Sequence, residues 1–332
     1  RKYIFTLTFT FSILLILIGT IINLNDGFEK RFSKSELEII EPNRSEMSQC
    51  EYKTPIVNYP KISFCNIGSD ITSNGTIAFI GDSHLDSLVD SLDEKLKNEK
   101  LNGFKIDNKY CEPMVFVYRN SSLSYEQRQK CTESHYALIN HLNSINVEDV
   151  FILYRWTFRL YPIPNNISSL TYDNGEGGIE YVKHYRKYYA FDGEKFSISF
   201  DSKKNAVKKL ITSFNNSNIK THLIYPVPES GWNMSKFNMV QLLKGGDIPE
   251  LLSTSYKKYL ERNKFILNLL NEIEESNLVS KIMTENVFCK KILPDRCLVQ
   301  FNYKPLYYDA DHLSNFGAKL LVEEIINHYK SQ

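Results

Sequence analysis

The stretch TIAFIGDSHLDSLVDSLDEKL, residues 76–96, decides the fold. Residues 76–80 form a short apolar run with β-favouring side chains, which is typical of a buried parallel strand. A sharp Gly-Asp-Ser-His turn follows at 81–84. Apolar residues then recur at helical spacing, which predicts an amphipathic helix over residues 85–99. The order of strand, tight turn and helix is the opening of a βαβ unit.

Similar units follow along the chain. Alternating strands and helices indicate a parallel sheet with helices on both faces, so we expect an α/β fold. Residues 157–200, rich in Tyr, Gly and charge, fit this alternation poorly. We expect them to be an insertion over the carboxyl ends of the strands, where ligand sites of α/β proteins lie. The further elements we expect are strands at 149–154, 221–228 and 280–288 and helices at 206–214, 254–276 and 315–329.

The N-terminal segment predicts a membrane helix. Residues 3–24 contain no charged side chain, and this is about the length that a helix needs to cross a bilayer. A signal peptide is the alternative, but its apolar region is usually shorter and ends at a small-residue cleavage site. The basic pair Arg1-Lys2 favours a cytoplasmic N-terminus, although Lys30, Arg31 and Lys34 on the other side weaken this bias.

Three parts are therefore expected along the chain. They are a transmembrane helix at 1–24, a polar stalk outside the cytoplasm at 25–60, and a folded domain at 61–332. The chain lies in the plasma or inner membrane in this interpretation, with the folded domain on the periplasmic or extracellular side. Because the first residue is Arg1 and not Met, we expect the chain to be processed or to be part of a longer protein.

The charges are nearly balanced, with 40 lysines and arginines against 39 aspartates and glutamates. A net charge of +1 gives no general attraction to nucleic acid, so we expect no nucleic-acid partner. The hydrophobic fraction of 42% is ordinary for a globular protein with a packed core.

The cysteines support the placement outside the cytoplasm. There are six, and an even number in an exported domain suggests disulfides. A zinc site is the rival, but the sequence has no Cys-x-x-Cys and no His at ligand spacing from a cysteine pair, so we expect no metal. Six cysteines allow about fifteen pairings, and proximity in the sequence favours one of them: Cys50–Cys65, Cys111–Cys131 and Cys289–Cys297.

Two short motifs carry the chemistry. Gly81-Asp82-Ser83-His84 comes directly after a buried strand, and Asp309-Ala310-Asp311-His312 comes just before the last helix. A serine hydroxyl is a poor nucleophile until a base takes its proton, and the base needs a carboxylate that fixes its tautomer. Each motif alone is also compatible with ordinary helix capping or a structural histidine, but together and in this order they are far more specific.

This pair of motifs resembles the SGNH, or GDSL-like, hydrolase superfamily, which has a flavodoxin-like parallel sheet. The resemblance is closest to the SGNH domains that are fused behind the many-helix membrane domain of acyltransferase-three proteins, which modify bacterial surface glycans. It runs from about residue 50 to the end. The stretches that carry it are Cys-x-Ile-Gly at 65–68, GDSH at 81–84, Cys-Glu-Pro at 111–113, FILYRW at 151–156, YPVPESGW at 225–232 and YYDADHLSNFGA at 307–318.

The resemblance implies a catalytic triad. Ser83 would be the nucleophile, His312 the general base and Asp309 the carboxylate that orients it, because the partner carboxylate in this superfamily stands three residues before the histidine. Asp311 is the nearest competitor and is interpreted as a turn or cap residue. His84 either contacts substrate or bonds to the backbone beside the turn. No cofactor is implied.

The sequence departs from the superfamily pattern at the oxyanion site. After the strand that should precede the conserved Asn it has Arg155-Trp156, and Gly103 is the nearby candidate for the glycine of the second block. Arg155 and Trp156 are therefore candidates for oxyanion or substrate contacts. Arg155 could equally form a salt bridge at the edge of the sheet, and Trp156 could be ordinary packing.

The leading functional hypothesis is O-acyl transfer, such as O-acetylation, to a cell-surface glycan. A membrane acyltransferase domain would deliver the acyl donor, and an extracellular glycan would be the acceptor. A membrane-anchored carbohydrate esterase or deacetylase would use the same triad. The third hypothesis is a glycan-binding SGNH module without catalysis.

Overall fold

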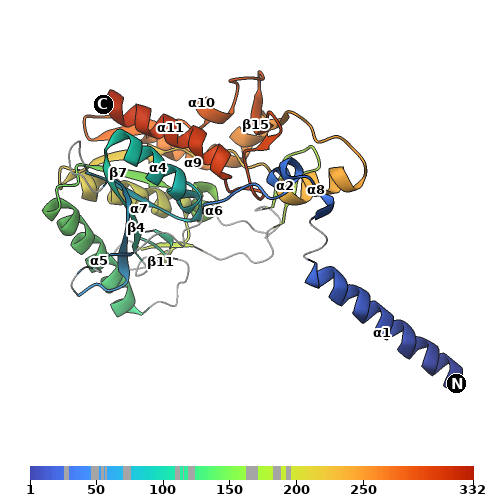
Figure 1. Ribbon diagram of the computed structural model, residues 1–332. Coiled ribbons are helices and arrows are strands. Elements are labelled where there is room, and N and C mark those ends of the chain that lie inside the picture. Colours follow the sequence, from blue (N-terminus) through green and yellow to red (C-terminus); the bar gives the residue numbers. More distant parts are fainter. Residues whose placement is uncertain are drawn as a thin grey trace.

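A seven-stranded, mostly parallel sheet forms the centre of the protein (Figure 1). The computed structural model describes residues 1–25, 30–45, 52–53, 56, 58–69, 76–108, 113–114, 116–118, 124–161, 171–181, 188–191 and 196–332. In spatial order the strands are β1 (Tyr52–Lys53), β2 (Ile62–Gly68), β4 (Asn102–Asn108), β3 (Thr76–Gly81), β7 (Asp149–Leu153), β12 (Lys220–Ile224) and β14 (Val279–Ile282).

The five strands from β4 to β14 run parallel, whereas β2 pairs antiparallel with β4 and β1 antiparallel with β2. Parallel strands that are buried on both faces read as continuous apolar runs, and β3 and β7 have that character. The expected α/β class is confirmed.

Helices cover both faces of the sheet and make two cores (Figure 1). On one face, α4 (Val89–Glu99) and α11 (Asn315–Ser331) bury leucines and isoleucines against β3. On the other face, α5 (Tyr125–Ser144) and α7 (Phe200–Asn215) do the same against β7 and β12, together with much of α9 (Tyr256–Glu272). These layers hold the carboxyl ends of the parallel strands in fixed positions.

Several predicted elements differ from the observed ones at their ends. The helix expected at 85–99 is two helices, α3 (Ser83–Asp86) and α4. The strand expected at 221–228 ends at Ile224, because Pro226 and Pro228 have no N–H for a ladder. The strand expected at 280–288 ends at Ile282 and continues into α10 (Glu285–Phe288).

The described part of the expected insertion at 157–200 forms short elements outside the main sheet. The helix α6 (Trp156–Leu160) leads into it. The hairpin of β8 (Tyr172–Asp173) and β9 (Ile179–Glu180) is tied to the carboxyl end of β7 by the ion pair between Glu180 and Arg155. The remaining small elements are β5 (Pro113–Met114), β6 (Val117–Tyr118), β10 (Tyr189–Phe191), β11 (Phe196–Ser197), α8 (Met234–Leu243), β13 (Leu252–Ser255), β15 (Arg296–Phe301) and β16 (Lys304–Pro305).

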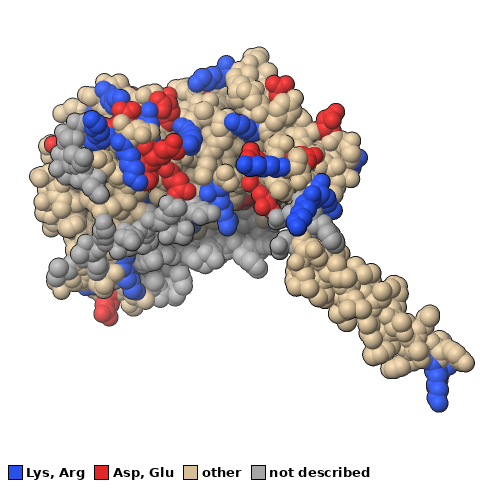
Figure 2. All heavy atoms as spheres, in the orientation of Figure 1, with Lys and Arg blue, Asp and Glu red and all other residues tan. Residues whose placement is uncertain are grey.

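The helix α1 (Lys2–Leu24) extends away from the domain and has no buried residue. Among the described residues it is the one helix that is long and apolar enough to cross a membrane. Figure 2 shows it as a rod that carries basic side chains at its free end and no other charged side chain along its length.

Part of the segment expected to be a stalk belongs to the folded domain. The helix α2 (Lys34–Ile40) begins with a capping box between Ser33 and Glu36. It packs on α8, its Ile40 is 1% exposed, and the backbone N–H of Asn315 donates to the carbonyl of Asn43 at 2.7 Å. The segment from α2 to Asn43 therefore packs on the domain beside the start of α11.

The disulfide between Cys289 and Cys297 is confirmed. Cys65 and Cys131 are also disulfide-bonded. The partners that the sequence analysis expects for them, Cys50 and Cys111, lie outside the described residues.

Candidate active site

Ser83 stands where β3 turns into α3. The turn is tight because Gly81 lies against the backbone of β7, where a Cβ would collide with the carbonyl oxygen of Leu153. Asp82 is the N-cap of α3 and accepts a hydrogen bond from the His84 backbone N–H at 3.2 Å. Ser83 is the first residue of the helix, so no intrahelical carbonyl can accept its N–H, and its side chain is exposed. The hydroxyl of Ser83 therefore lies in a solvent-accessible turn at the start of α3.

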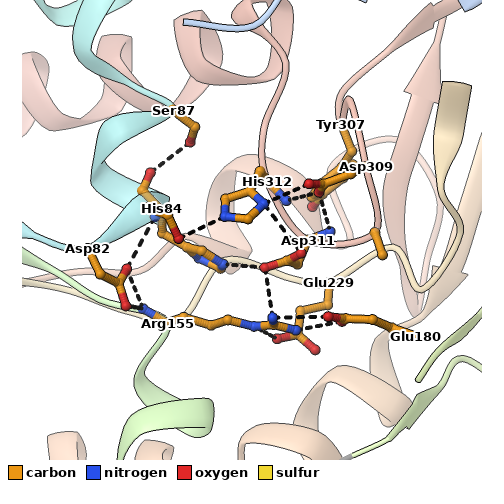
Figure 3. Close-up of polar contacts among 12 residues, drawn as sticks. Asp82, His84, Ser87, Arg155, Glu180, Glu229, Tyr307, Asp309, Asp311 and His312 are labelled. Carbon is orange, nitrogen blue, oxygen red and sulfur yellow. Dashed lines mark hydrogen bonds and ion pairs between the residues drawn. The ribbon is translucent and has the colours of Figure 1, made fainter. Parts of the chain in front are cut away.

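The structure brings the three predicted triad residues into one chain of hydrogen bonds. His312 Nε2 lies 2.8 Å from Ser83 Oγ. On its other side, His312 Nδ1 lies 2.8 Å from Asp309 Oδ2 (Figure 3). Ser83 and His312 are 229 positions apart, and the sheet brings them together from opposite ends of the domain. This is the arrangement in which an imidazole can take the serine proton while a carboxylate holds its other nitrogen.

The loop that carries His312 is shaped by Asp309. Its Oδ1 accepts hydrogen bonds from the backbone N–H groups of Asp311 at 3.0 Å and His312 at 2.8 Å. This Asx-type turn leaves Oδ2 for the imidazole. Ser314 then caps α11 by accepting from the Gly317 N–H, so the helix begins three residues after the histidine.

The surroundings of His312 favour its protonated form. Burial alone would lower the pKa of the imidazole. The hydrogen bond that His312 donates to Asp309 and the charges of Asp311 and Asp309 outweigh burial and raise the pKa of His312 to about 8. The ring also stacks on Tyr308, with centroids 5.5 Å apart, and meets the His84 ring edge-on at 5.2 Å.

Asp82 anchors the turn that carries Ser83 to the residues after the neighbouring strand β7. Its carboxylate accepts from the Arg155 backbone N–H at 3.1 Å and from Arg159 Nε at 2.8 Å. Burial alone would raise the pKa of Asp82, but Arg159 and the backbone donors outweigh burial and hold it below the usual range. The turn that presents Ser83 is thus tied to the residues that follow β7.

A second group of charges lies beneath the triad. The Arg155 guanidinium binds Glu229 through Nε at 2.8 Å, Glu180 at 2.5 and 3.0 Å, and Asp311 at 3.0 Å (Figure 3). Burial alone would raise the pKa of Glu229, yet Arg155 and Arg262 bring it to about 2. The sequence analysis allowed a salt bridge for Arg155 as the alternative to a substrate contact, but it could not name the partners, because the members of the network come from four separate stretches.

Three residues that the sequence suggested for substrate or oxyanion contacts lie in the interior or at the other end of the sheet. Trp156 is 1% exposed, and its indole N–H donates to the carbonyl of Ile224 at 2.9 Å, so it is a core residue and its burial does not support a substrate contact. His84 is 3% exposed and bonds Asp311, not the backbone as the alternative expected. Gly103 pairs with Ile77 at the amino end of β3, the opposite end from Ser83, which excludes it from the oxyanion site.

Among the described residues, one cluster has the composition of a metal site. The ligand atoms of His84, Asp311 and His312 lie within 4.8 Å of one another. They are already engaged, however: His84 Nε2 bonds Asp311, and both nitrogens of His312 serve the chain of hydrogen bonds to Ser83 and Asp309. The arrangement fits proton transfer better than metal ligation.

Comparison with known proteins gives one family match. The family described as "SGNH domain (fused to AT3 domains)" matches residues 49–327. No curated protein matches the chain. The matched range covers most of the chain and contains both motifs.

Two solved structures match the chain at low sequence identity. The periplasmic domain of a lipopolysaccharide acetyltransferase from Salmonella ser. Paratyphi A is 16% identical, with a TM-score of 0.48 over 78% of this chain and 85% of that one. A protein described as an acylhydrolase from Bacteroides fragilis NCTC 9343 is 11% identical, with a TM-score of 0.35 over 80% of this chain and 90% of that one.

Proposed function

The chain belongs to the family of SGNH domains that are fused to AT3 domains, and we propose that it is an O-acyltransferase that uses Ser83 to place acyl groups on a cell-surface glycan. The observation that carries the proposal is the chain of hydrogen bonds from Asp309 through His312 to Ser83, with 2.8 Å at each step. The family supports chemistry on acyl esters, and this geometry supports a serine mechanism for it.

The reaction would proceed in two halves. In the first, His312 takes the Ser83 proton while Oγ attacks the acyl carbonyl of the donor. The bond to the leaving group then breaks, the leaving group takes the proton from His312, and an acyl ester forms on Ser83. In the second half, His312 takes the proton of a sugar hydroxyl, whose oxygen attacks the acyl-enzyme. The new sugar ester leaves, and Ser83 regains its proton.

The negative charge that develops on the acyl oxygen needs a donor close to Ser83. We assign this contact to the Ser83 amide, which lies at the first turn of α3 beside the nucleophile. Arg155 is less suited, because its guanidinium already donates to three carboxylates. Its role in the proposal is to hold the charges beneath His312.

The membrane arrangement follows from the same proposal. The helix α1 spans the bilayer with Arg1 and Lys2 on the cytoplasmic side, and the domain lies outside. The disulfide Cys289–Cys297 supports an oxidising compartment. A membrane acyltransferase domain would deliver the acyl donor to Ser83, and the glycan would approach from outside.

Hydrolysis is the second candidate. The side chain of Ser83 is exposed, so water can reach an acyl group bound there. An esterase or deacetylase would need no change in the triad. The two functions differ in which hydroxyl completes the second half.

Ser83→Ala tests the shared step. The purified full chain is supplied with p-nitrophenyl acetate, with and without a panel of methyl glycosides, and both p-nitrophenol and acetylated glycosides are measured. We expect Ser83→Ala to reduce both by at least about a thousandfold, because a triad nucleophile cannot be replaced by its neighbours. Ser331→Ala, at the exposed end of α11, is the matched control. Acetylated glycoside supports transfer, acetate alone supports hydrolysis, and a fully active Ser83→Ala protein contradicts both.

A further inference from the structure

Asp311 is a buried carboxylate beside the proposed general base. It is 5% exposed, and its Oδ2 lies 3.0 Å from His84 Nε2 and 3.0 Å from Arg155 Nη1. Its other oxygen, Oδ1, lies 3.4 Å from His312 Nδ1. The turn or cap role expected from the sequence does not account for the contacts with His84 and Arg155, which come from other parts of the chain.

We propose that Asp311 is a second carboxylate for His312, held in place by Arg155 and His84, and that it stabilises the imidazolium that forms when Ser83 gives up its proton. This inference rests on the proposed function for its chemical meaning. Asp311 and Arg155 act through His312 and are therefore positioning residues.

Distance separates the tasks of the two carboxylates. Asp309 Oδ2, at 2.8 Å from His312 Nδ1, has hydrogen-bond geometry and fixes the tautomer. Asp311 Oδ1, at 3.4 Å from the same nitrogen, is too far for a good hydrogen bond but close enough for a charge interaction with the imidazole. Asp311 can therefore contribute charge without competing for the proton on Nδ1.

Arg155 is the ion-pair partner of the buried Asp311. A buried carboxylate is costly unless it is paired, and the Arg155 guanidinium lies 3.0 Å from Asp311 Oδ2. In the wider network, Arg155 and Arg262 face the three carboxylates of Glu180, Glu229 and Asp311. Three carboxylates thus face two guanidinium groups, and Asp311 is the member of the network next to His312.

His84 fits this arrangement as a hydrogen-bond donor to Asp311. Its Nε2 lies 3.0 Å from Asp311 Oδ2, and its buried Nδ1 has no partner in the part of the chain that the structure describes. Nε2 is therefore the nitrogen that donates, and His84 orients the Asp311 carboxylate.

The test is a pH titration of His312 itself. The titration is monitored by NMR on the full chain in detergent, with isotope-labelled histidine. The groups that face this imidazole are Asp309, Asp311, Tyr308, His84 and Arg155. We expect Asp311→Asn to lower the pKa of His312 by about one unit, since one nearby charge is removed and the Asp309 hydrogen bond is kept. Asp201→Asn, an exposed acid at the start of α7, should leave the titration unchanged. An unchanged titration in Asp311→Asn would overturn the proposal.

Two further measurements keep the proposal testable if Asp311→Asn folds poorly. In Asp309→Asn, where Asp311 remains, His312 should still titrate above the ordinary histidine value, and a titration at or below that value would contradict us. Arg155→Lys should lower kcat for p-nitrophenyl acetate about tenfold in the wild-type background but not further when Asp311 is already Asn, because Arg155 acts through Asp311. Additive losses would show that it does not.

The NMR result does not depend on catalysis. An active Ser83→Ala protein would remove the proposed function, whereas the influence of Asp311 on the His312 titration would still stand or fall by itself.

Discussion

At the scale of single residues, the site places two carboxylates beside one imidazole, and their distances predict unequal effects. Asp309→Asn removes the 2.8 Å hydrogen bond that holds the tautomer of His312. We expect kcat for p-nitrophenyl acetate to fall by about ten-thousand-fold, as in a serine protease triad. Asp311→Asn removes charge only, and about tenfold is expected above pH 8. Reversed magnitudes in correctly folded proteins would show that Asp311, not Asp309, orients the base.

The pH dependence of the reaction follows from His312. A general base must be neutral to accept a proton, and the pKa of this imidazole is raised to about 8 by Asp309 and Asp311 against the effect of burial. Activity should therefore be low at pH 6, half-maximal near pH 8 and close to its plateau above about pH 9, with the slope of a single proton. A plateau that is already reached at pH 6 would contradict the raised pKa.

At the same scale, the sequence predicts neighbours in the chain better than neighbours in space. Ser83, Asp309 and His312 could be proposed because their spacing within two motifs and their places next to a strand and a helix are local features. The contacts of Arg155 with Glu180 and Glu229 join residues 25 and 74 positions apart, and no local pattern encodes them. Trp156 follows the same strand, but its burial depends on packing that only the fold determines.

At the scale of elements, the most regular segments were predicted best. The apolar runs of β3 and β7 gave clear strands, and the amphipathic pattern of α4 gave a helix. The strand β4 was not predicted, because its sequence NGFKIDN has a glycine and two charged residues. Its Lys105 is 1% exposed and paired with Asp86 and Asp107, so tertiary ion pairs make a polar residue acceptable inside the fold.

The helix α2 provides an energetic test at this scale. Ile40 is 1% exposed in the contact of α2 with the domain, although the segment was expected to be a stalk. Ile40→Ala should destabilise the protein by about 3 kcal/mol in denaturant unfolding, because it leaves a cavity in a packed site. Leu243→Ala, 55% exposed at the end of α8, is the control and should change little. Equal small effects would mean that α2 is not part of the cooperative fold.

At the scale of the whole molecule, α1 is structurally separate from the folded domain. The helix has no buried residue, so the packing of the domain does not depend on it. A protein lacking residues 1–25 should move from the membrane fraction to the soluble fraction while retaining the hydrolysis of p-nitrophenyl acetate. Membrane association that persists in the shortened protein would show that another surface, and not α1, makes the anchor.

The central claim is that the sheet brings Ser83, His312 and Asp309 together in order to form an acyl-enzyme. The most direct measurement is mass spectrometry of the protein after brief reaction with p-nitrophenyl acetate and quenching in acid, followed by peptide mapping. We predict one acetyl group on the peptide that contains Ser83, formed in the wild type and absent from Ser83→Ala. Turnover without any acetyl group on this peptide, or with the group on another residue, would contradict the account.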